Sequence, residues 1–563
     1  MSRIKSLSFV ILATLVLPLA SAGAAMEDEQ WPIPDNPNYG HHSVLVDGSS
    51  EPGSAFSILS MDGPSGQVIC TATSDEKCTD LQSGRYRAFL PQCQGAQDVD
   101  CIESVEASEP GNFLEYIYGL KHPNLFQGDG VITPAHASEP SIWSIPSAAH
   151  AFGDEYLVQV SLSNSLVRGQ DLSADTQFAI NVSPISRMKT ANTIEDINGF
   201  SNYPKCIEQV NPEGTNILAC GEGAQEYGSY RCVAKMINDA VCLLRHAFPR
   251  DVRIKVIVRL KKEPAAMLHG RLSNPLISIT QEIFGTKISV EAASVRVPTL
   301  YSGGDYSALS DDLKKYWDTC ISERTCAFST RQNGNNWSNP AQRNVQDYAE
   351  AFGSRALKLI PTFAASVQDK SIAAPSSWSI RTLSRDQMRF STACFKSGTG
   401  FIGVVTTNST TYSEGPPTFE DDRLTYKVAS LHYLPDGSIF YGSYDLILRS
   451  DVARCLYGFS KAPISASISV LSEDGAAQVA TTVVNESENW IYLSAKGFTF
   501  SSPSIAVRLV QEEVVATPTP TPSPTPTSVA KKREMITCKK GKTVKKVVAA
   551  NPRCPKGYKR VAP

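Results

Sequence analysis

The sequence lacks the short motifs that most directly assign an activity. It contains no Cys-x-x-Cys, no His-Glu-x-x-His, no Gly-x-Ser-x-Gly and no phosphate-binding loop. The sequence therefore lacks the signature motifs of thiol redox centres, zinc peptidases, α/β-hydrolases and P-loop enzymes. The eight histidines are scattered, so we expect no metal site and no cofactor. His41 and His42 could bind a metal, but a polar loop after Gly40 is the interpretation that we prefer.

Long hydrophobic runs are also missing after residue 25, so we expect no transmembrane segment in the mature chain. Residues 1–25 begin with Arg3 and Lys5, continue with the apolar run Leu7–Leu19 and end in small residues. This is the pattern of a cleavable signal peptide, and the apolar run is too short to span a bilayer. A retained anchor is the alternative. No LPxTG-type sorting sequence supports a covalent wall anchor.

Charge is distributed very unevenly. Residues 530–563 contain twelve Lys and Arg and one Glu, a net charge of +11. Removing this charge and the +2 of residues 1–25 from the −3 of the whole chain leaves −16 for the segment between them. Such asymmetry is typical of a tail that meets an anionic partner.

Cysteine is plentiful, and fourteen cysteines can all be oxidised after export. The sequence does not determine their connectivity, but pairing between sequence neighbours is our prediction. The predicted pairs are Cys70/Cys78, Cys93/Cys101, Cys206/Cys220, Cys232/Cys242, Cys320/Cys326, Cys394/Cys455 and Cys538/Cys554.

Short apolar runs between turn residues predict a mainly β protein of several β-sandwich-like domains, stapled by disulfides, with a helical segment around 307–363. The predicted divisions are a signal peptide (1–25), an N-terminal Cys-rich β region (26–145), a β-sandwich-like domain (146–300), a helix-containing region (301–390), a C-terminal antiparallel β domain (391–512), a Thr/Pro linker (516–528) and a basic disulfide-bonded tail (530–563).

Two patterns predict particular strands. Val252–Leu260 alternates, but Ile257 interrupts its polar side, so both sides of this strand are expected to be partly covered. Leu424–Tyr433 and Ser438–Leu448 flank a Pro-Asp-Gly turn at 435–437 and predict a hairpin.

Two further patterns predict helices. Ser310 can cap a helix that begins with Asp311 and Asp312, whose carboxylates suit the first turn. Apolar residues at helical spacing after Pro340, as far as Leu359, predict a second helix.

The tail resembles a C-terminal extension of secreted and surface proteins of actinobacteria, which often follows a Pro/Thr-rich stalk. The resemblance rests on Ile536–Cys538, Lys540–Lys542, Lys545–Lys546 and Pro552–Tyr558, about 30 residues of 563. It implies location at the cell surface and no activity. Asp100–Val105 and Phe498–Ser501 loosely resemble surface proteins of the same bacteria.

The tail's basic residues suit a polyanion outside the cell, such as an anionic wall polymer. The expected wall-binding residues are Lys531, Lys532, Arg533, Lys539, Lys540, Lys542, Lys545, Lys546, Lys556, Lys559 and Arg560. Attraction to phosphate is independent of base sequence, so nucleic acid is conceivable. We do not expect it, because only Tyr558 is available to stack on bases. A solubilising tail without a partner is the other alternative.

One loop suits a carbohydrate ligand: Asn333, Asn335 and Asn336 surround Trp337, combining amide groups with an aromatic face. A plain loop fits these residues better. Two acidic clusters, at 311–312 and 420–422, could supply the carboxylates of a glycosidase. A helix start and a solvated turn are the preferred interpretations. The sequence thus favours a non-enzymatic surface protein for adhesion, envelope structure or ligand capture, with a secreted polysaccharide hydrolase as the alternative.

The cysteine pattern predicts that the oxidised, mature protein has no free thiol. Alkylation without reduction, followed by mass spectrometry, should label no cysteine, because every cysteine has a neighbour in an oxidising compartment. Several labelled cysteines would contradict this prediction. A bridge such as Cys78 to Cys232 would refute pairing between neighbours.

Overall fold

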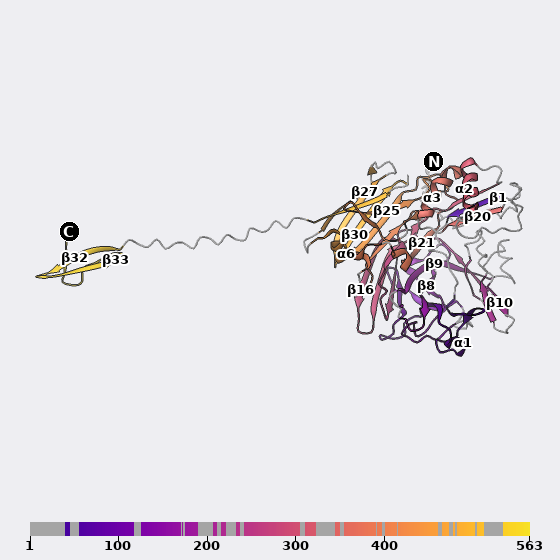
Figure 1. Cartoon of the computed structure of the whole chain (residues 1–563), viewed down its shortest axis with the longest axis horizontal. Helices are drawn as coiled ribbons and strands as arrows, with labels where there is room; N and C mark the ends of the chain where they lie inside the picture. Colours follow the sequence, from indigo (N-terminus) through magenta and orange to yellow (C-terminus); the bar gives the residue numbers. More distant parts are fainter. Residues whose placement is uncertain are drawn as a thin grey trace, which may run out of the picture. The chain divides into compact units, whose positions relative to one another are not determined.

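The structure is a computed structural model. It describes residues 40–45, 56–117, 125–170, 172, 175–189, 206–210, 216–220, 232–236, 241–304, 310–322, 344–349, 354–389, 391–396, 400–413, 415–459, 464–471, 477–478, 481–500, 504–511 and 533–562. The chain forms two compact units, a body up to Gln511 and a tail from Glu512 (Figure 1). Strands dominate the described residues, so the prediction of a mainly β protein is confirmed.

A 16-stranded sheet runs through the body. Its main path is β29 (Thr481–Ser487), β30 (Trp490–Phe498), β26 (Gly442–Arg449), β22 (Gly403–Thr407), β15 (Met267–Arg271), β21 (Ser376–Thr382), β9 (Gln177–Lys189), β8 (Glu155–Val167), β4 (Ser83–Phe89), β2 (Ile58–Gly63) and β3 (Gly66–Ile69). The strands that branch from it are β6 (Asn112–Tyr116), β7 (Ser141–Ser144), β12 (Cys232–Met236), β13 (Val241–Arg245) and β18 (Val295–Arg296). Neighbours on the main path are antiparallel, except that β15 and β22 are parallel.

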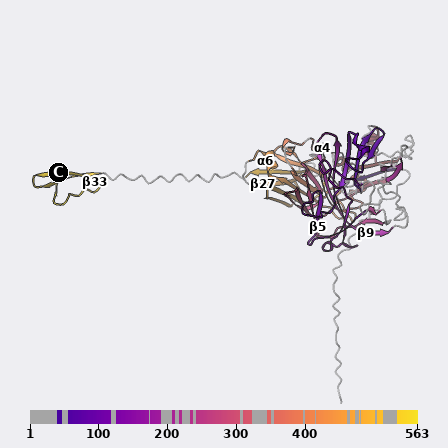
Figure 2. The ribbon, with the colours of Figure 1, turned by 90° about the horizontal axis from the view of Figure 1, so that it is seen from below.

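Two smaller sheets belong to the same body. One has four strands, β16 (Ser273–Gln281), β17 (Thr286–Ala293), β14 (Arg253–Leu260) and β5 (Cys101–Glu106). The other has six, β23 (Thr411–Tyr412), β24 (Thr418–Glu420), β25 (Arg423–Ala429), β31 (Ser504–Gln511), β27 (Ile464–Leu471) and β28 (Ala477–Gln478). In Figure 1, β25 and β27 lie at one end of the body and β8 and β9 near its middle, and Figure 2 shows the same ribbon from below.

The remaining elements are short. The strands are β1 (Gly40–Leu45), β10 (Cys206–Val210), β11 (Asn216–Cys220), β19 (Leu300–Gly304) and β20 (Asn344–Ala349). The helices are α1 (Glu76–Thr79), η2 (Pro146–Ala148), α2 (Asp311–Ser322), α3 (Ser354–Ala364), η7 (Ala365–Val367), α4 (Arg385–Met388), α5 (Ala393–Lys396) and α6 (Ser450–Tyr457).

The four-stranded sheet packs against the large sheet and closes the first hydrophobic core. Ile254, Val256 and Val258 of β14 are fully buried there, as the alternation of this strand predicts. Ile257 on the other side of the strand is also buried, so the expectation that both sides are covered is confirmed. Trp378 of β21 lies in the same core and donates its indole N–H to the carbonyl of Ala292, at 2.9 Å.

The six-stranded sheet closes a second core against the opposite face of the large sheet. Neighbouring residues on one strand must point to opposite faces. On β22, Val404 packs in the first core and Val405 in the second, and on β26 the same holds for Ile447 and Leu446. The strands β15, β22 and β26 are therefore covered on both sides and form the middle layer of a double sandwich.

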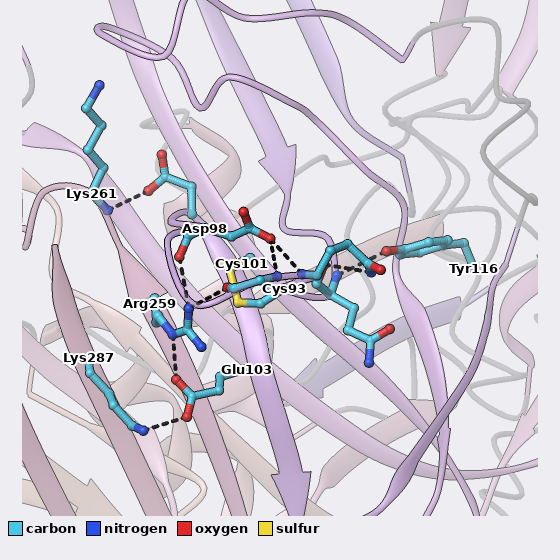
Figure 3. Close-up of a disulfide and its surroundings, with 12 residues drawn as sticks. Cys93, Asp98, Cys101, Glu103, Tyr116, Arg259, Lys261 and Lys287 are labelled. Carbon is cyan, nitrogen blue, oxygen red and sulfur yellow. Dashed lines mark hydrogen bonds and ion pairs between the residues drawn. A yellow bond between two sulfur atoms is a disulfide. The ribbon is translucent and has the colours of Figure 1, made fainter. Parts of the chain in front are cut away.

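The Cys93–Cys101 disulfide stiffens the loop that leads into β5 (Figure 3). Asp98 accepts hydrogen bonds from the backbone of Gln94 and Gly95, both at 2.7 Å. Arg259 of β14 donates to the Gly95 carbonyl at 2.8 Å and to the Glu103 carboxylate at 2.6 Å. The disulfide loop is thus tied both to itself and to the sheet that it enters.

Four of the predicted pairings are present, namely Cys70–Cys78, Cys93–Cys101, Cys394–Cys455 and Cys538–Cys554. The register of β10 and β11 sets Cys206 opposite Cys220. The side chains of Cys206, Cys220, Cys232, Cys242, Cys320 and Cys326 lie outside the described residues.

The hairpin predicted around Pro435 is wrong in its pairing. The turn is there, with φ +83° at Gly437, but the two arms share only a single bridge between Tyr433 and Ile439. The first arm, β25, pairs with β31, and the second, β26, pairs with β22 and β30. The turn therefore joins two layers, the six-stranded sheet and the large sheet, which face each other across the second core.

The second predicted helix is only partly correct. Asn344–Ala349 forms β20, which pairs in parallel with β1, and helix α3 begins at Ser354. Pairing with a distant strand overrides the local helical spacing in this segment. The first helix begins at Asp311 as predicted, and the Leu313 amide donates to the Ser310 hydroxyl at 3.4 Å.

The large sheet takes strands from all four segments into which the sequence pattern divides the body. We therefore expect the two cores to unfold together. Ile447→Ala in the first core and Leu446→Ala in the second should each lower the free energy of unfolding by about 2–5 kcal/mol.

Denaturation followed by tryptophan fluorescence and by far-ultraviolet circular dichroism tests this coupling. Both probes should shift together in both variants, although Trp143 and Trp378 lie in the first core. Ile439→Ala is the matched control, since Ile439 is 48% exposed and should cost under about 1 kcal/mol. Separate transitions for Leu446→Ala would show that the cores are independent.

Candidate functional site in the C-terminal tail

The described part of the tail folds into a miniature three-stranded sheet. Strands β32 (Glu534–Lys540) and β33 (Thr543–Ala549) form a hairpin, and β34 (Lys559–Val561) pairs with the other edge of β32. The hairpin turns at Gly541, whose φ of +58° is a conformation that glycine adopts without a steric penalty.

A disulfide compensates for the small core of this sheet. Cys538 and Cys554 are joined across 16 residues, and Ile536 and Cys538 are the buried side chains of β32. The Lys545 ammonium lies over the ring of Tyr558, 5.6 Å from its centroid. A unit of this size cannot bury enough apolar surface to hold its shape without such a staple.

The predicted wall-binding residues of the tail are exposed wherever the structure describes them. These are Arg533, Lys539, Lys540, Lys542, Lys545, Lys546, Lys556, Lys559 and Arg560. Lys531 and Lys532 lie outside the described residues. Arg553 is exposed as well and adds a cation that the predicted set omits.

The electrostatics of the tail are one-sided. Glu534 is the single acidic side chain between 533 and 562, and no salt bridge is recorded within this stretch. The tail can therefore attract an anionic partner from several directions. Each contact would be weak alone, because exposed charges are well solvated.

Of the other sequence candidates, the structure describes the two acidic clusters but not the asparagine-rich loop. The loop with Asn333, Asn335, Asn336 and Trp337 lies outside the described residues. Asp311 and Asp312 begin α2, and Glu420 to Asp422 form the exposed turn between β24 and β25, so both preferred interpretations of the acidic clusters are confirmed.

The body contains a buried polar cluster that the sequence patterns did not reveal. Arg271 on β15 is fully buried and donates to the carbonyls of Thr407, Ser409 and Thr410, at 3.0, 2.6 and 3.3 Å. Its guanidinium also lies 4.6 Å from the centroid of the Tyr412 ring. This cation holds the loop by which the chain leaves the large sheet for the six-stranded sheet.

His269, two residues earlier on β15, belongs to the same cluster. Its Nε2 lies 3.4 Å from the hydroxyl of Tyr426, which donates to the Ser413 carbonyl at 2.9 Å. Burial, followed by the positive charge of Arg381, holds the pKa of His269 well below its ordinary value. The ring is therefore neutral and serves the packing between layers.

Asp369 and His432 form a second pair that the sequence did not reveal. One Asp369 carboxylate oxygen accepts from the His432 amide at 3.0 Å, and the other contacts His432 Nδ1. The Tyr433 amide donates to the Asp369 carbonyl at 3.1 Å. With side chain and backbone both engaged, the pair joins the turn after η7 to the segment before Pro435.

Two further properties of the described residues concern metal ligands and membrane-spanning helices. Within them, no group of three or more His, Cys, Asp or Glu side chains is placed to hold a metal ion. No helix in the described part of the chain has the length and apolar character needed to cross a membrane.

Comparison with known proteins gives no match: no family model, no curated protein and no solved structure aligns significantly with this chain.

Glu139 is the clearest buried acid of the body. It is fully buried, and neither carboxylate oxygen has a hydrogen-bond partner among the described residues. Burial raises the pKa of Glu139 to about 9, from an ordinary value of 4.5. The folded protein therefore keeps a proton that the unfolded chain releases, so stability falls as pH rises between these two pKa values.

Glu139→Gln should remove this pH dependence. At pH 5 its free energy of unfolding should be close to that of the native protein, and at pH 8 it should be higher, by a difference on the order of a few kcal/mol. Thermal unfolding at both pH values measures the effect. Glu282→Gln, at an exposed site, should leave the pH profile unchanged. A native protein more stable at pH 8 than Glu139→Gln would contradict the assignment.

Proposed function

We propose that this protein is secreted and associated with the cell surface, where the basic tail binds an anionic wall polymer and holds the acidic body close to it. The body has no enzymatic activity in this proposal and serves adhesion, envelope structure or ligand capture.

The observation that carries the proposal is the tail itself. It is a separate compact unit, closed by its own disulfide, and its basic side chains are exposed with a single carboxylate among them. A unit of this kind offers little besides charge and a small surface, which suits retention rather than chemistry.

The opposite net charges of the two parts of the chain determine which part is attracted to an anionic wall. Residues 26–529, of net charge −16, are repelled by an anionic wall, while residues 530–563, of net charge +11, are attracted and release counterions on binding. The Thr/Pro residues 516–528 predict an extended spacer of roughly 40 Å, at about 3.1 Å per residue. This length lets the tail engage the wall while the body stays in solution.

Secretion is supported by the four disulfides, since such bonds persist in oxidising compartments. The alternative of a polysaccharide hydrolase gains no support from the described residues, in which the two acidic clusters have structural positions.

A chain that ends before Ala516 should lose its association with cells or purified wall. The expected measurement is the fraction of protein that sediments with the wall, and it should fall close to background. The full chain should be released by 1 M salt, where the screening length is about 3 Å.

A chain that lacks only 516–528 is the matched control, because it keeps all twelve tail cations and should still sediment. If the truncated chain sediments as well as the full chain, or if molar salt releases nothing, electrostatic retention by the tail is wrong.

A further inference from the structure

We propose that one face of the tail sheet docks on an anionic lipid surface, through apolar side chains that enter the lipid and lysines that meet its phosphates. This inference rests on the proposed function, in that the tail is the part that makes contact. It gives this face of the tail a partner other than the wall polymer, because the face is apolar as well as charged.

The strand register defines two faces of the sheet. Residues directly opposite one another in antiparallel strands share a face. One face, which we call the closed face, carries Ile536, Cys538 and their cross-strand partners, and it holds the disulfide core. The other, the open face, consists of Met535, Thr537, Lys539, Val544, Lys546, Val548, Lys559 and Val561.

The open face is apolar and uncovered. The exposed fractions of Met535, Val544, Val548 and Val561 are 60%, 54%, 56% and 41%. All the large exposed hydrophobic side chains of residues 533–562 belong to this face. Apolar side chains gathered on one side of so small a unit mark a contact surface.

Lysines are interleaved with these apolar groups. Lys539 is opposite Val544 and Lys559, and Lys546 is opposite Thr537, which is itself opposite Val561. Glu534, the only carboxylate side chain of the stretch, pairs with Ala549 and therefore belongs to the closed face. The open face is thus cationic as well as apolar.

A soluble polyanion would neutralise the lysines and leave four apolar side chains in water. A lipid surface accommodates both groups, because valine and methionine can enter the boundary below the headgroups while lysine stems extend to the phosphates. Anionic headgroups also add an attraction that grows with each lysine. The composition of this face therefore favours an anionic lipid over a free polymer.

The experiment uses the full oxidised chain and vesicles of phosphatidylglycerol and phosphatidylcholine in equal parts. Vesicles of pure phosphatidylcholine and soluble polyphosphate serve as the two comparisons. One variant replaces the apolar groups, M535S/V544T/V548T/V561T, in which threonine keeps the β-branched shape. Another, K539Q/K546Q/K559Q, removes the open-face charges. The matched control, K542Q/R553Q/K556Q, removes as many charges from turns and loops.

The native chain should bind the anionic vesicles and bind the neutral ones far more weakly. The apolar variant should lose vesicle binding by roughly tenfold or more and keep its affinity for polyphosphate. The open-face lysine variant should lose vesicle binding by roughly a hundredfold, and the matched control by less. An intact Cys538–Cys554 bridge in each variant, mapped by mass spectrometry, shows that the sheet is closed.

Four results would overturn the inference. If the apolar variant binds anionic vesicles as tightly as the native chain, the open face does not enter lipid. If the native chain binds polyphosphate and not vesicles, the inference fails while retention by a wall polymer stands. Binding to neither ligand would count against both. Capture of an acidic protein by the native chain, without vesicle binding, would assign the face to that partner.

Discussion

The architecture depends on a sheet whose middle strands are buried on both faces. Strands β15, β22 and β26 have no side that meets water, so every side chain on them must be apolar or have its polar atoms satisfied within the protein. Arg271 satisfies this requirement. It donates hydrogen bonds to three carbonyls at the point where the chain passes from one layer to the next. Neutral His269 and the Tyr426 hydroxyl extend the same solution. Arg271 is thereby accounted for by packing, whereas buried Glu139 and His269 Nδ1 have no hydrogen-bond partner among the described residues.

The body and the tail solve the problem of stability in opposite ways. The body buries two large cores and can carry an acidic surface at little cost. The tail buries almost nothing beyond Ile536 and Cys538, so its disulfide and short hairpin replace a core, and its surface is left for contact. The acidic charge lies in the part of the chain that has large cores, and the basic charge lies in the part whose surface is left for contact.

Local structure could be predicted from the sequence, whereas the partners of the strands could not. Alternation located β14, and Ser310 marked the start of α2. The partners of β25 and β26 were not predicted. A Pro-Asp-Gly sequence indicates a turn in the backbone, but it does not indicate which strands pair with the segments on either side. The tail cations were predictable from composition, but the open face was not, because it depends on the register of three strands. Arg271 and Asp369 gave no signal, since their partners are distant in sequence or are backbone groups.

The order in which the large sheet can be assembled follows from the pairing of β9 with β21. The Phe178 amide donates to the Thr382 hydroxyl, 204 residues further along the chain. Strand β15 likewise pairs with β22, which comes much later in the sequence. Contacts of such long range close late, because the intervening chain must lose its freedom before they form. The short loops closed by Cys70–Cys78 and Cys93–Cys101 can form early, because each bridge spans only 8 residues. The middle of the sheet has no partner until the chain is nearly complete. We therefore expect the body to pass through a half-built sheet with an unpaired edge, a state that is prone to association.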